Sequence, residues 1–259
     1  MLLDLYAGAV EDALAREQVV PREQIYAAAE NATPALRARD YLYNPSRVRV
    51  ISEIKRASPS RGEIAAIESP GELARVYEDA GAGAISVLTE GRKFHGSLQD
   101  LDSVRAVVSV PVLRKDFIAN EYQVLEARAH GADIVLLIAA GLEPQTLRNL
   151  KALIEDLGMS ALVETHSEAE VLLACELGAE LIGINARDLE TFETDRALFG
   201  KFVSLIDTDA VKIAESAVRS VADVVDYASQ GADCVLVGEA FVTGDAAALV
   251  RSFSEVQKP

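Results

Sequence analysis

The 259-residue sequence predicts an α/β fold, a (βα)8 barrel preceded by a helical extension. Three observations predict it. From residue 48 onward, eight short β-branched apolar runs alternate with amphipathic segments about three turns long. A Gly-Ala pair recurs directly before four of these runs. Charged side chains gather near the C-terminal ends of the runs, where barrel enzymes place their active sites. Together these patterns favour a closed barrel over a doubly wound open sheet.

Residues 1–47 precede the repeating pattern. Two amphipathic helices are expected there, at about 2–17 and 22–31, followed by a connection that contains two prolines. We expect this extension to brace or cover the barrel, which occupies residues 48–259. No linker rich in Gly, Ser or Pro separates the two parts, so the chain is expected to form one domain.

Each expected strand of the barrel leads through a helix to the next, except the last. The strands are expected at 49–55, 84–90, 111–117, 133–140, 160–166, 181–188, 211–217 and 234–241. The Gly-Ala pairs begin at Gly81, Gly131, Gly178 and Gly231, about two βα units apart. Each glycine is expected to end a helix in the left-handed conformation, and the strand then begins at once.

The overall charge and composition restrict the partners. A formal net charge of -16 would repel a nucleic-acid backbone or an anionic membrane, so neither is expected as a partner. The N-terminus has no basic segment followed by a long apolar one, so no secretory signal is expected. No apolar run reaches the roughly 18 residues of a membrane-spanning helix. We therefore expect a cytoplasmic protein.

Charged groups stand late in several expected strands. Strands of a parallel barrel are buried on both faces, so an ionised group within one needs a reason. The positions concerned are Glu53, Lys55, Lys115, Glu164, Asn185, Arg187 and Glu215. A network of ion pairs held only for stability is one explanation, but buried pairs often stabilise no better than apolar packing. An anionic substrate and proton transfer explain the cluster better.

Small and polar residues after three of the strands suggest a phosphate site. The segment 58–62 follows the first strand, Ser216 and Ala217 lie at the end of the seventh, and Gly238 and Glu239 lie at the end of the eighth. Barrel enzymes commonly bind phosphate in the loops after strands seven and eight. Each of these segments is also an ordinary turn sequence, so the indication depends on their coming together.

The histidines and cysteines suggest no metal site. His130 stands at a helix end, where a structural role is expected. His95 and His166 fall in loops where they could contact substrate, but no third ligand accompanies them at metal-binding spacing. Cys175 and Cys234 have no paired spacing, so both are expected to be packed thiols.

Seven stretches carry more specific sequence. They are SEIKRASPSRG (52–62), SVLTEGRKFHGSLQDL (86–101), PVLRKDF (111–117), EYQVLEARAHGADIVLLIAA (121–140), LVETHSEAE (162–170), IGINARDLETF (182–192) and VLVGEAFV (235–242). Across the whole barrel these stretches resemble the indole-3-glycerol phosphate synthase family. EIKRASPS and PVLRKDF together are the most specific, whereas residues 1–47 resemble the family only loosely.

The resemblance implies a reaction without a cofactor. The implied substrate is 1-(2-carboxyphenylamino)-1-deoxyribulose 5-phosphate, which is cyclised, decarboxylated and dehydrated to indole-3-glycerol phosphate in tryptophan biosynthesis. Lys115 would be the acid of ring closure, Glu164 the base, and Lys55 the partner of the substrate carboxylate and a candidate acid of dehydration. The sequence does not fix which lysine acts in which step. Desolvation and the second lysine would lower the pKa of the acidic lysine, while the glutamates would oppose that shift.

The resemblance also implies the remaining contacts. Glu53 would orient the lysines, and family members are often monomers, so a monomer is expected. The other implied contacts are Asn185, Arg187 and Glu215 in the pocket wall, Phe94, Phe117 and Leu136 at the aromatic ring, and Ser58, Ser216, Ala217, Gly238 and Glu239 at the phosphate.

One departure from the family concerns the seventh strand. Where the family usually has Ser-Glu-Ser-Gly-Ile, residues 214–218 are Ala-Glu-Ser-Ala-Val, so Ala217 adds a methyl group near the expected phosphate. A weakened phosphate affinity or a shifted loop is expected. The alternatives are a phosphoribosylanthranilate isomerase-like barrel, which would need a cysteine where Lys55 stands, and a catalytically idle paralogue that acts as a binding subunit.

Overall fold

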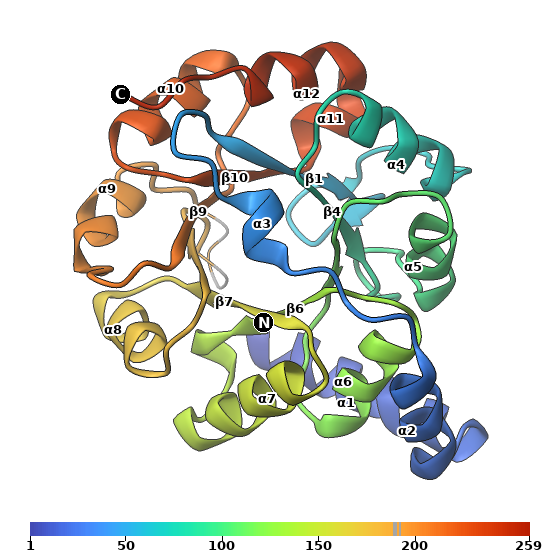
Figure 1. The fold of residues 1–259 in the computed structure, drawn as a ribbon. Coiled ribbons are helices and arrows are strands. Elements are labelled where there is room, and N and C mark those ends of the chain that lie inside the picture. Colours follow the sequence, from blue (N-terminus) through green and yellow to red (C-terminus); the bar gives the residue numbers. More distant parts are fainter. Residues whose placement is uncertain (189–190, 192) are drawn as a thin grey trace.

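The strands form a closed barrel, as Figure 1 shows. The computed structural model describes residues 1–188, 191 and 193–259, so the last part of the stretch 182–192 lies outside the described residues. Within them, eight parallel strands follow one another around the barrel in chain order. They are β1 (Arg49–Ile54), β4 (Ala84–Leu88), β5 (Val112–Lys115), β6 (Ile134–Ile138), β7 (Ser160–Thr165), β8 (Leu181–Asn185), β9 (Val211–Glu215) and β10 (Cys234–Val237).

Pairing between the first and last strands closes the barrel. Arg49 of β1 stands beside Cys234 of β10, and Ile51 stands beside Ala84 of β4 on the other side. Every predicted strand is confirmed, but each ends one to four residues earlier than expected. The last apolar residues of the predicted runs belong to the loops and short helices that form the C-terminal mouth of the barrel.

Helices cover the outside of the barrel. The α-helices are α4 (Pro70–Asp79), α5 (Leu98–Arg105), α6 (Glu121–Ala129), α7 (Pro144–Asp156), α8 (Glu168–Glu176), α9 (Leu198–Phe202), α10 (Val221–Ser229), α11 (Glu239–Thr243) and α12 (Ala246–Ser254), with 3-10 turns η1 (Ala139–Gly141) and η2 (Val203–Leu205). The four glycines of the predicted repeat all have positive φ, which confirms the left-handed helix ends.

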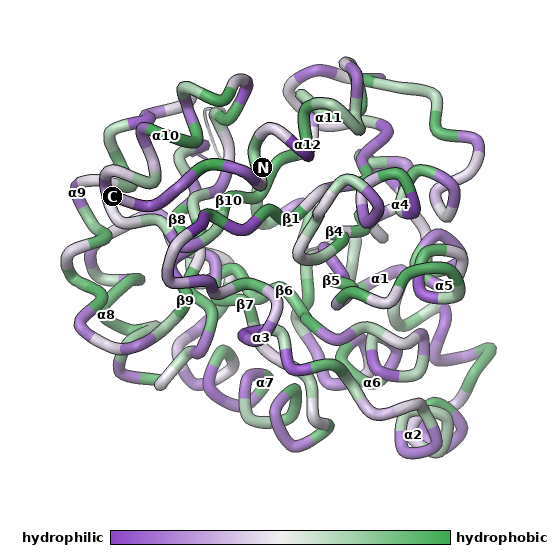
Figure 2. The backbone as a smooth tube through the Cα atoms, turned by 45° about the horizontal axis from the view of Figure 1, so that its top comes forward, coloured by the Kyte–Doolittle hydropathy of each residue, from purple (hydrophilic) through white to green (hydrophobic). Residues whose placement is uncertain are grey.

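Apolar side chains fill two layers. One cluster packs between strands and helices, and a second fills the barrel interior. Figure 2 shows hydrophobic colour concentrated along the strands, with the entirely apolar β6 as a clear case. Because strands in a parallel barrel are buried on both sides, such runs are expected. Among the described residues, no helix has the length and hydropathy needed to cross a bilayer.

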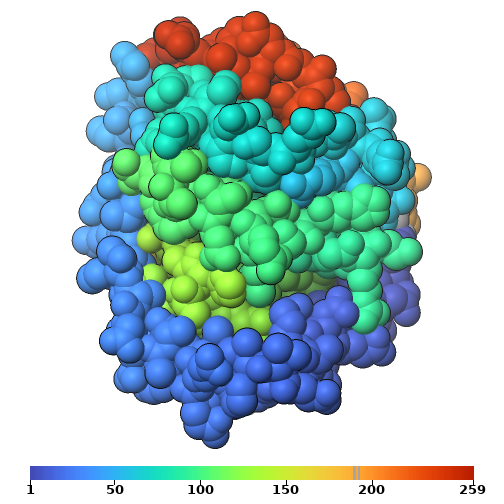
Figure 3. All heavy atoms as spheres, turned by 90° about the vertical axis from the view of Figure 1, so that its right-hand side faces the viewer, coloured from blue at the N-terminus to red at the C-terminus, as the bar shows by residue number. Residues whose placement is uncertain are grey.

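The N-terminal extension contacts both ends of the barrel. It forms α1 (Leu2–Val19), α2 (Arg22–Asn31) and α3 (Ala38–Leu42). Helix α3 contacts the barrel near the start of β1, where Arg49 Nε donates to the carbonyl of Tyr41 at 2.7 Å. The start of α1 lies at the opposite end, where the Tyr6 hydroxyl donates to the carbonyl of Ile138. Figure 3 shows the extension in blue along the left and lower edges of the molecule.

Some short elements of the structure were not predicted, among them a helix and a hairpin. Helix α3 has five residues, and the antiparallel pair β2 (Ala57–Ser58) and β3 (Gly62–Glu63) has two residues in each strand. Segments this short contain too few residues to show a helical or strand period. The β2–β3 hairpin is important for the site, because it places Ser58 beside the C-terminal mouth.

Candidate active site

A cavity of about 410 Å³ opens at the C-terminal mouth of the barrel. All predicted site residues line it except Glu164 and Leu136. The predicted residues in its wall are Glu53, Lys55, Ser58, Phe94, Lys115, Phe117, Asn185, Arg187, Glu215, Ser216, Ala217, Gly238 and Glu239. They come from six different strands or the loops that follow them, so only the closed barrel brings them together.

Lys115 lies between two buried carboxylates. Its Nζ atom is 3.1 Å from Glu164 Oε2 and 2.9 Å from Glu215 Oε2. Asn185 Nδ2 donates to the other oxygen of Glu164 at 3.0 Å. Glu164 and Glu215 are almost fully buried, but Glu215 and Asn185 line the cavity together with Lys115. Glu164 lies behind it and outside the cavity wall.

The ionisation of this group follows from burial and from the close charges. Burial alone lowers the pKa of Lys115, but Glu215, Glu164 and Glu53 raise it by more, so the lysine remains an ammonium. Of the two opposing effects expected from the sequence, the effect of the glutamates on the pKa of Lys115 is the larger. Burial raises the pKa of Glu215 to about 8, despite Lys115. Burial also acts to raise the pKa of Glu164, but Lys115 and His166 hold it well below its usual value.

A second ion pair lies at the end of β1. Lys55, the first residue after this strand, has its Nζ 2.6 Å from Glu53 Oε1, as expected for side chains two residues apart in extended chain. A methyl group on Gly238 would meet Glu53 Oε1, and one on Gly183 would meet Glu215 Oε1. These two glycines therefore make room for the buried carboxylates.

Aromatic rings form one wall. The centroids of Phe94 and Phe117 are 6.0 Å apart, and Tyr6 of α1 meets Phe117 edge-on at 5.6 Å. Leu5, the neighbour of Tyr6, lines the cavity. The extension thus contributes to the site, which sequence reasoning left open. Leu136 is buried in the barrel interior and is not among the lining residues.

Small residues form the opposite end. Ser216 and Ala217 have φ angles of 68° and 60°, which place two consecutive non-glycine residues in the left-handed region. The Ser216 hydroxyl donates to Asn185 Oδ1 at 2.7 Å. Arg61 Nη2 lies 3.0 Å from Glu239 Oε1, which joins the β2–β3 hairpin to the start of α11.

Comparison with known proteins identifies this arrangement. The family model for indole-3-glycerol phosphate synthase matches residues 3–253. The chain is 55% identical over 256 residues to the indole-3-glycerol phosphate synthase of Leifsonia xyli subsp. xyli, covering 99% of this chain and 98% of the relative. The chain belongs to the indole-3-glycerol phosphate synthase family. The enzyme of that name from Mycolicibacterium gilvum is 54% identical over 243 residues, 94% of this chain and 89% of its own length.

Membership of the indole-3-glycerol phosphate synthase family assigns the activity, a carboxy-lyase reaction of tryptophan biosynthesis. Solved structures support the fold alone. The 3-hexulose-6-phosphate synthase of Salmonella typhimurium superposes with a TM-score of 0.63 at 17% identity, over 80% of this chain and 97% of that one. The N-acetylmannosamine-6-phosphate 2-epimerase of Clostridium perfringens superposes with a TM-score of 0.62 at 16% identity, over 79% of this chain and 90% of that one.

The three histidines are not among the residues that line the cavity at the C-terminal mouth. His166 Nε2 is 3.3 Å from Glu164 Oε1 and its Nδ1 is 3.5 Å from Glu170 Oε2. Burial alone lowers the pKa of His166, but Glu164 and Glu170 have a larger, opposite effect, and the pKa rises to about 10. His166 is therefore a cation behind Glu164. His95 lines a neighbouring hollow, and His130 Nδ1 lies 2.7 Å from Asp102 on the helix layer.

The cysteines lie away from the reacting end. Cys234 is buried at the start of β10, and Cys175 lies within α8, so neither contributes to the described cavity wall. A cysteine base like that of the isomerase alternative is thus missing from the described lining, and Lys55 stands at the end of the first strand. Across residues 1–188, 191 and 193–259, no group of three His, Cys, Asp or Glu side chains is placed to hold a metal.

Proposed function

We propose that Lys115 is the acid and Glu164 the base in the conversion of 1-(2-carboxyphenylamino)-1-deoxyribulose 5-phosphate to indole-3-glycerol phosphate. One observation carries the proposal: the Lys115 ammonium lies between two buried glutamates and faces a cavity with an aromatic wall and a small-residue end. Such a cavity suits a substrate with an aromatic ring at one end and a phosphate at the other.

The chemistry requires a proton at the sugar oxygen. When the aromatic carbon attacks the sugar carbonyl, negative charge develops on that oxygen, and Lys115 Nζ donates a proton to it. The raised pKa of Lys115 keeps the proton on nitrogen until the more basic alkoxide forms. Loss of carbon dioxide leaves its electron pair in the ring system. Lys55 then donates a proton to the resulting hydroxyl, so that the oxygen leaves as water. Glu164 accepts, through the deprotonated Lys115 at 3.1 Å, the proton whose loss from carbon completes the indole.

The walls account for the two ends of the substrate. Lys55 supplies the cation for the substrate carboxylate, with Glu53 holding its Nζ at 2.6 Å. Phe94 and Phe117 contact the ring. The phosphate contacts are Ser58, Ser216, Ala217, Gly238 and Glu239, largely through backbone amides, because the Glu239 carboxylate is paired with Arg61. Asn185 and Arg187 shape the remaining wall.

We further propose a cytoplasmic monomer that acts as one domain, without a cofactor and without a nucleic-acid or membrane partner. The net charge of -16 supports this, since it disfavours both kinds of anionic surface. The contacts of the extension with both ends of the barrel support a single unit.

The two lysines can be distinguished by substitution. Lys115→Met should lower kcat by at least about a hundredfold, as expected when a general acid is removed, with a smaller effect on KM. Lys55→Met should raise KM as well, because a binding cation is lost along with any acid role in dehydration. Retention of kcat within about tenfold by a folded Lys115→Met protein would show that the acid is another group.

A further inference from the structure

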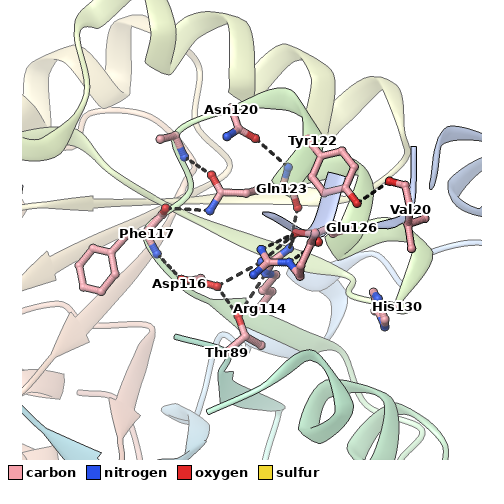
Figure 4. Close-up of polar contacts among 12 residues, drawn as sticks. Val20, Thr89, Arg114, Asp116, Phe117, Asn120, Tyr122, Gln123, Glu126 and His130 are labelled. Carbon is pink, nitrogen blue, oxygen red and sulfur yellow. Dashed lines mark hydrogen bonds and ion pairs between the residues drawn. The ribbon is translucent and has the colours of Figure 1, made fainter. Parts of the chain in front are cut away.

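A buried arginine stands directly before Lys115. Arg114 is fully buried, and because side chains alternate along a strand it faces the helix layer while Lys115 faces the cavity. Figure 4 shows its contacts. Its guanidinium donates to Thr89 Oγ1 at 3.1 Å, Asp116 Oδ2 at 3.1 Å and the carbonyl of Gln123 at 2.7 Å. Both terminal nitrogens also lie 3.4 Å from Glu126 Oε2.

The same glutamate receives a second arginine from the N-terminal extension. Arg16 of α1 donates from Nε to Glu126 Oε1 at 2.5 Å and from Nη2 to Oε2 at 2.8 Å. Arg16, Arg114, Asp116 and Glu126 form what we call the arginine–carboxylate network. Its two guanidinium and two carboxylate charges cancel. Three of its members are buried, whereas the Arg16 side chain is 37% exposed.

The network holds the backbone of an aromatic residue of the cavity. The Phe117 N–H donates to Asp116 Oδ1 at 2.8 Å, and the Phe117 carbonyl accepts from Gln123 Nε2 at 3.1 Å. Gln123 Oε1 accepts from the Ala119 N–H at 2.8 Å, which extends the hold over the following turn. The position of the Phe117 ring therefore depends on where Arg114 keeps Asp116.

Helix α1 thus acts on Phe117 by two routes. Tyr6 packs against the ring directly, and Arg16 reaches its backbone through the arginine–carboxylate network. We propose that Arg16 is a positioning residue that holds Phe117 in place to contact the aromatic half of the substrate. The packing of α1 against the barrel then affects substrate affinity through the charge of Arg16 as well as through the contact of Tyr6 with Phe117. This inference rests on the proposed function, in which Phe117 contacts the substrate ring.

The effect of removing Arg16 follows from the charges. Without it, Arg114 is the one cation left beside Glu126 among the described residues, and the network carries one uncompensated negative charge in a buried place. Arg114 then shifts toward Glu126, since the contacts at 3.4 Å can shorten, and its hold on Asp116 loosens. Asp116 keeps its hydrogen bond from the Thr89 hydroxyl at 2.6 Å, but it then holds the Phe117 N–H less firmly. The phosphate end, built from other strands, is unaffected.

The test compares Arg16→Met with Arg16→Lys and with a control variant at another contact between the N-terminal extension and α6. The control is Arg22→Met, because Arg22 also reaches α6 from the extension, at 2.9 Å from Glu121 Oε2, but in an exposed pair outside the network. The readouts are KM and kcat, competitive inhibition by 2-aminobenzoate and by inorganic phosphate, and hydrogen exchange at the amides of Phe117 and Ala119.

Arg16→Met should raise KM and the inhibition constant of 2-aminobenzoate by about threefold to tenfold, in the range of substitutions along coupled networks. The phosphate inhibition constant and kcat should change little, and the two amides should exchange faster. Arg16→Lys should restore much of the loss, and Arg22→Met should match the native protein. A native-like KM and native-like exchange in Arg16→Met would overturn the inference. An equal loss in Arg22→Met would also overturn it. A native protein without synthase activity would instead overturn the proposed function, and the exchange readout would still test the positioning.

Discussion

Ala217 offers the sharpest test of how this chain tolerates its departure from the family. Its φ of 60° places an alanine in the left-handed region, which costs an L-residue roughly 1–2 kcal/mol. In Ala217→Gly that cost disappears, but the glycine loses about 0.4–1 kcal/mol through the added freedom of the unfolded chain. The net expectation is a gain of roughly 0.5–1 kcal/mol, or a rise of about 2 °C in the melting temperature of a chain this size.

The assay is thermal unfolding of Ala217→Gly beside Ala214→Gly. Ala214 is a fully buried residue of β9, three positions earlier and in a strand, so it lacks the left-handed cost. Its substitution should destabilise by roughly 1–2 kcal/mol, because a buried methyl group is lost and a glycine enters a strand. Ala217→Gly should also lower KM if the methyl group hinders the phosphate. A variant that melts no higher than the native protein and keeps its KM would refute the reasoning.

Two further predictions follow from the same geometry. His166 has a pKa of about 10 in the folded protein against 6.5 when unfolded, so its stabilising contribution is complete below pH 6.5 and is lost as the pH rises toward 10. The melting temperature should therefore fall across that range, and His166→Gln should flatten the fall. An unchanged slope in His166→Gln would exclude the ion pairs with Glu164 and Glu170 as its cause. In Gly238→Ala the added methyl group would collide with Glu53 and lie 3.2 Å from Lys55 Nζ. In a folded protein kcat/KM should then fall by roughly tenfold or more, as expected when a catalytic group is misplaced. Full activity would mean that Glu53 can move freely.

Much of the barrel could be predicted because its strands are short apolar runs and its helices end at left-handed glycines. These signals are local, so they survive in the sequence alone. Helix α3 and the β2–β3 hairpin could not be predicted, since their form depends on packing against the barrel rather than on their own period.

Some residues of the site could likewise be predicted from the sequence, and others could not. Lys55 and Lys115 could be predicted because a charge inside a buried strand needs a reason. His166 was expected in a loop from which it could contact substrate, but it lies behind Glu164, since the direction of a loop side chain depends on tertiary contacts. Arg114 was overlooked, although an arginine between Leu113 and Lys115 carries the same signal as Lys115 itself. The roles of Leu5 and Arg16 depend on where α1 docks, which no local pattern encodes.

The most direct test of the account is turnover of 1-(2-carboxyphenylamino)-1-deoxyribulose 5-phosphate, followed by the fluorescence of the indole product. The native chain should form indole-3-glycerol phosphate in metal-free buffer, and folded Lys115→Ala and Glu164→Ala proteins should each lose at least about a hundredfold. A well-folded native chain that binds the substrate without converting it would contradict the account and would make the idle paralogue the better description.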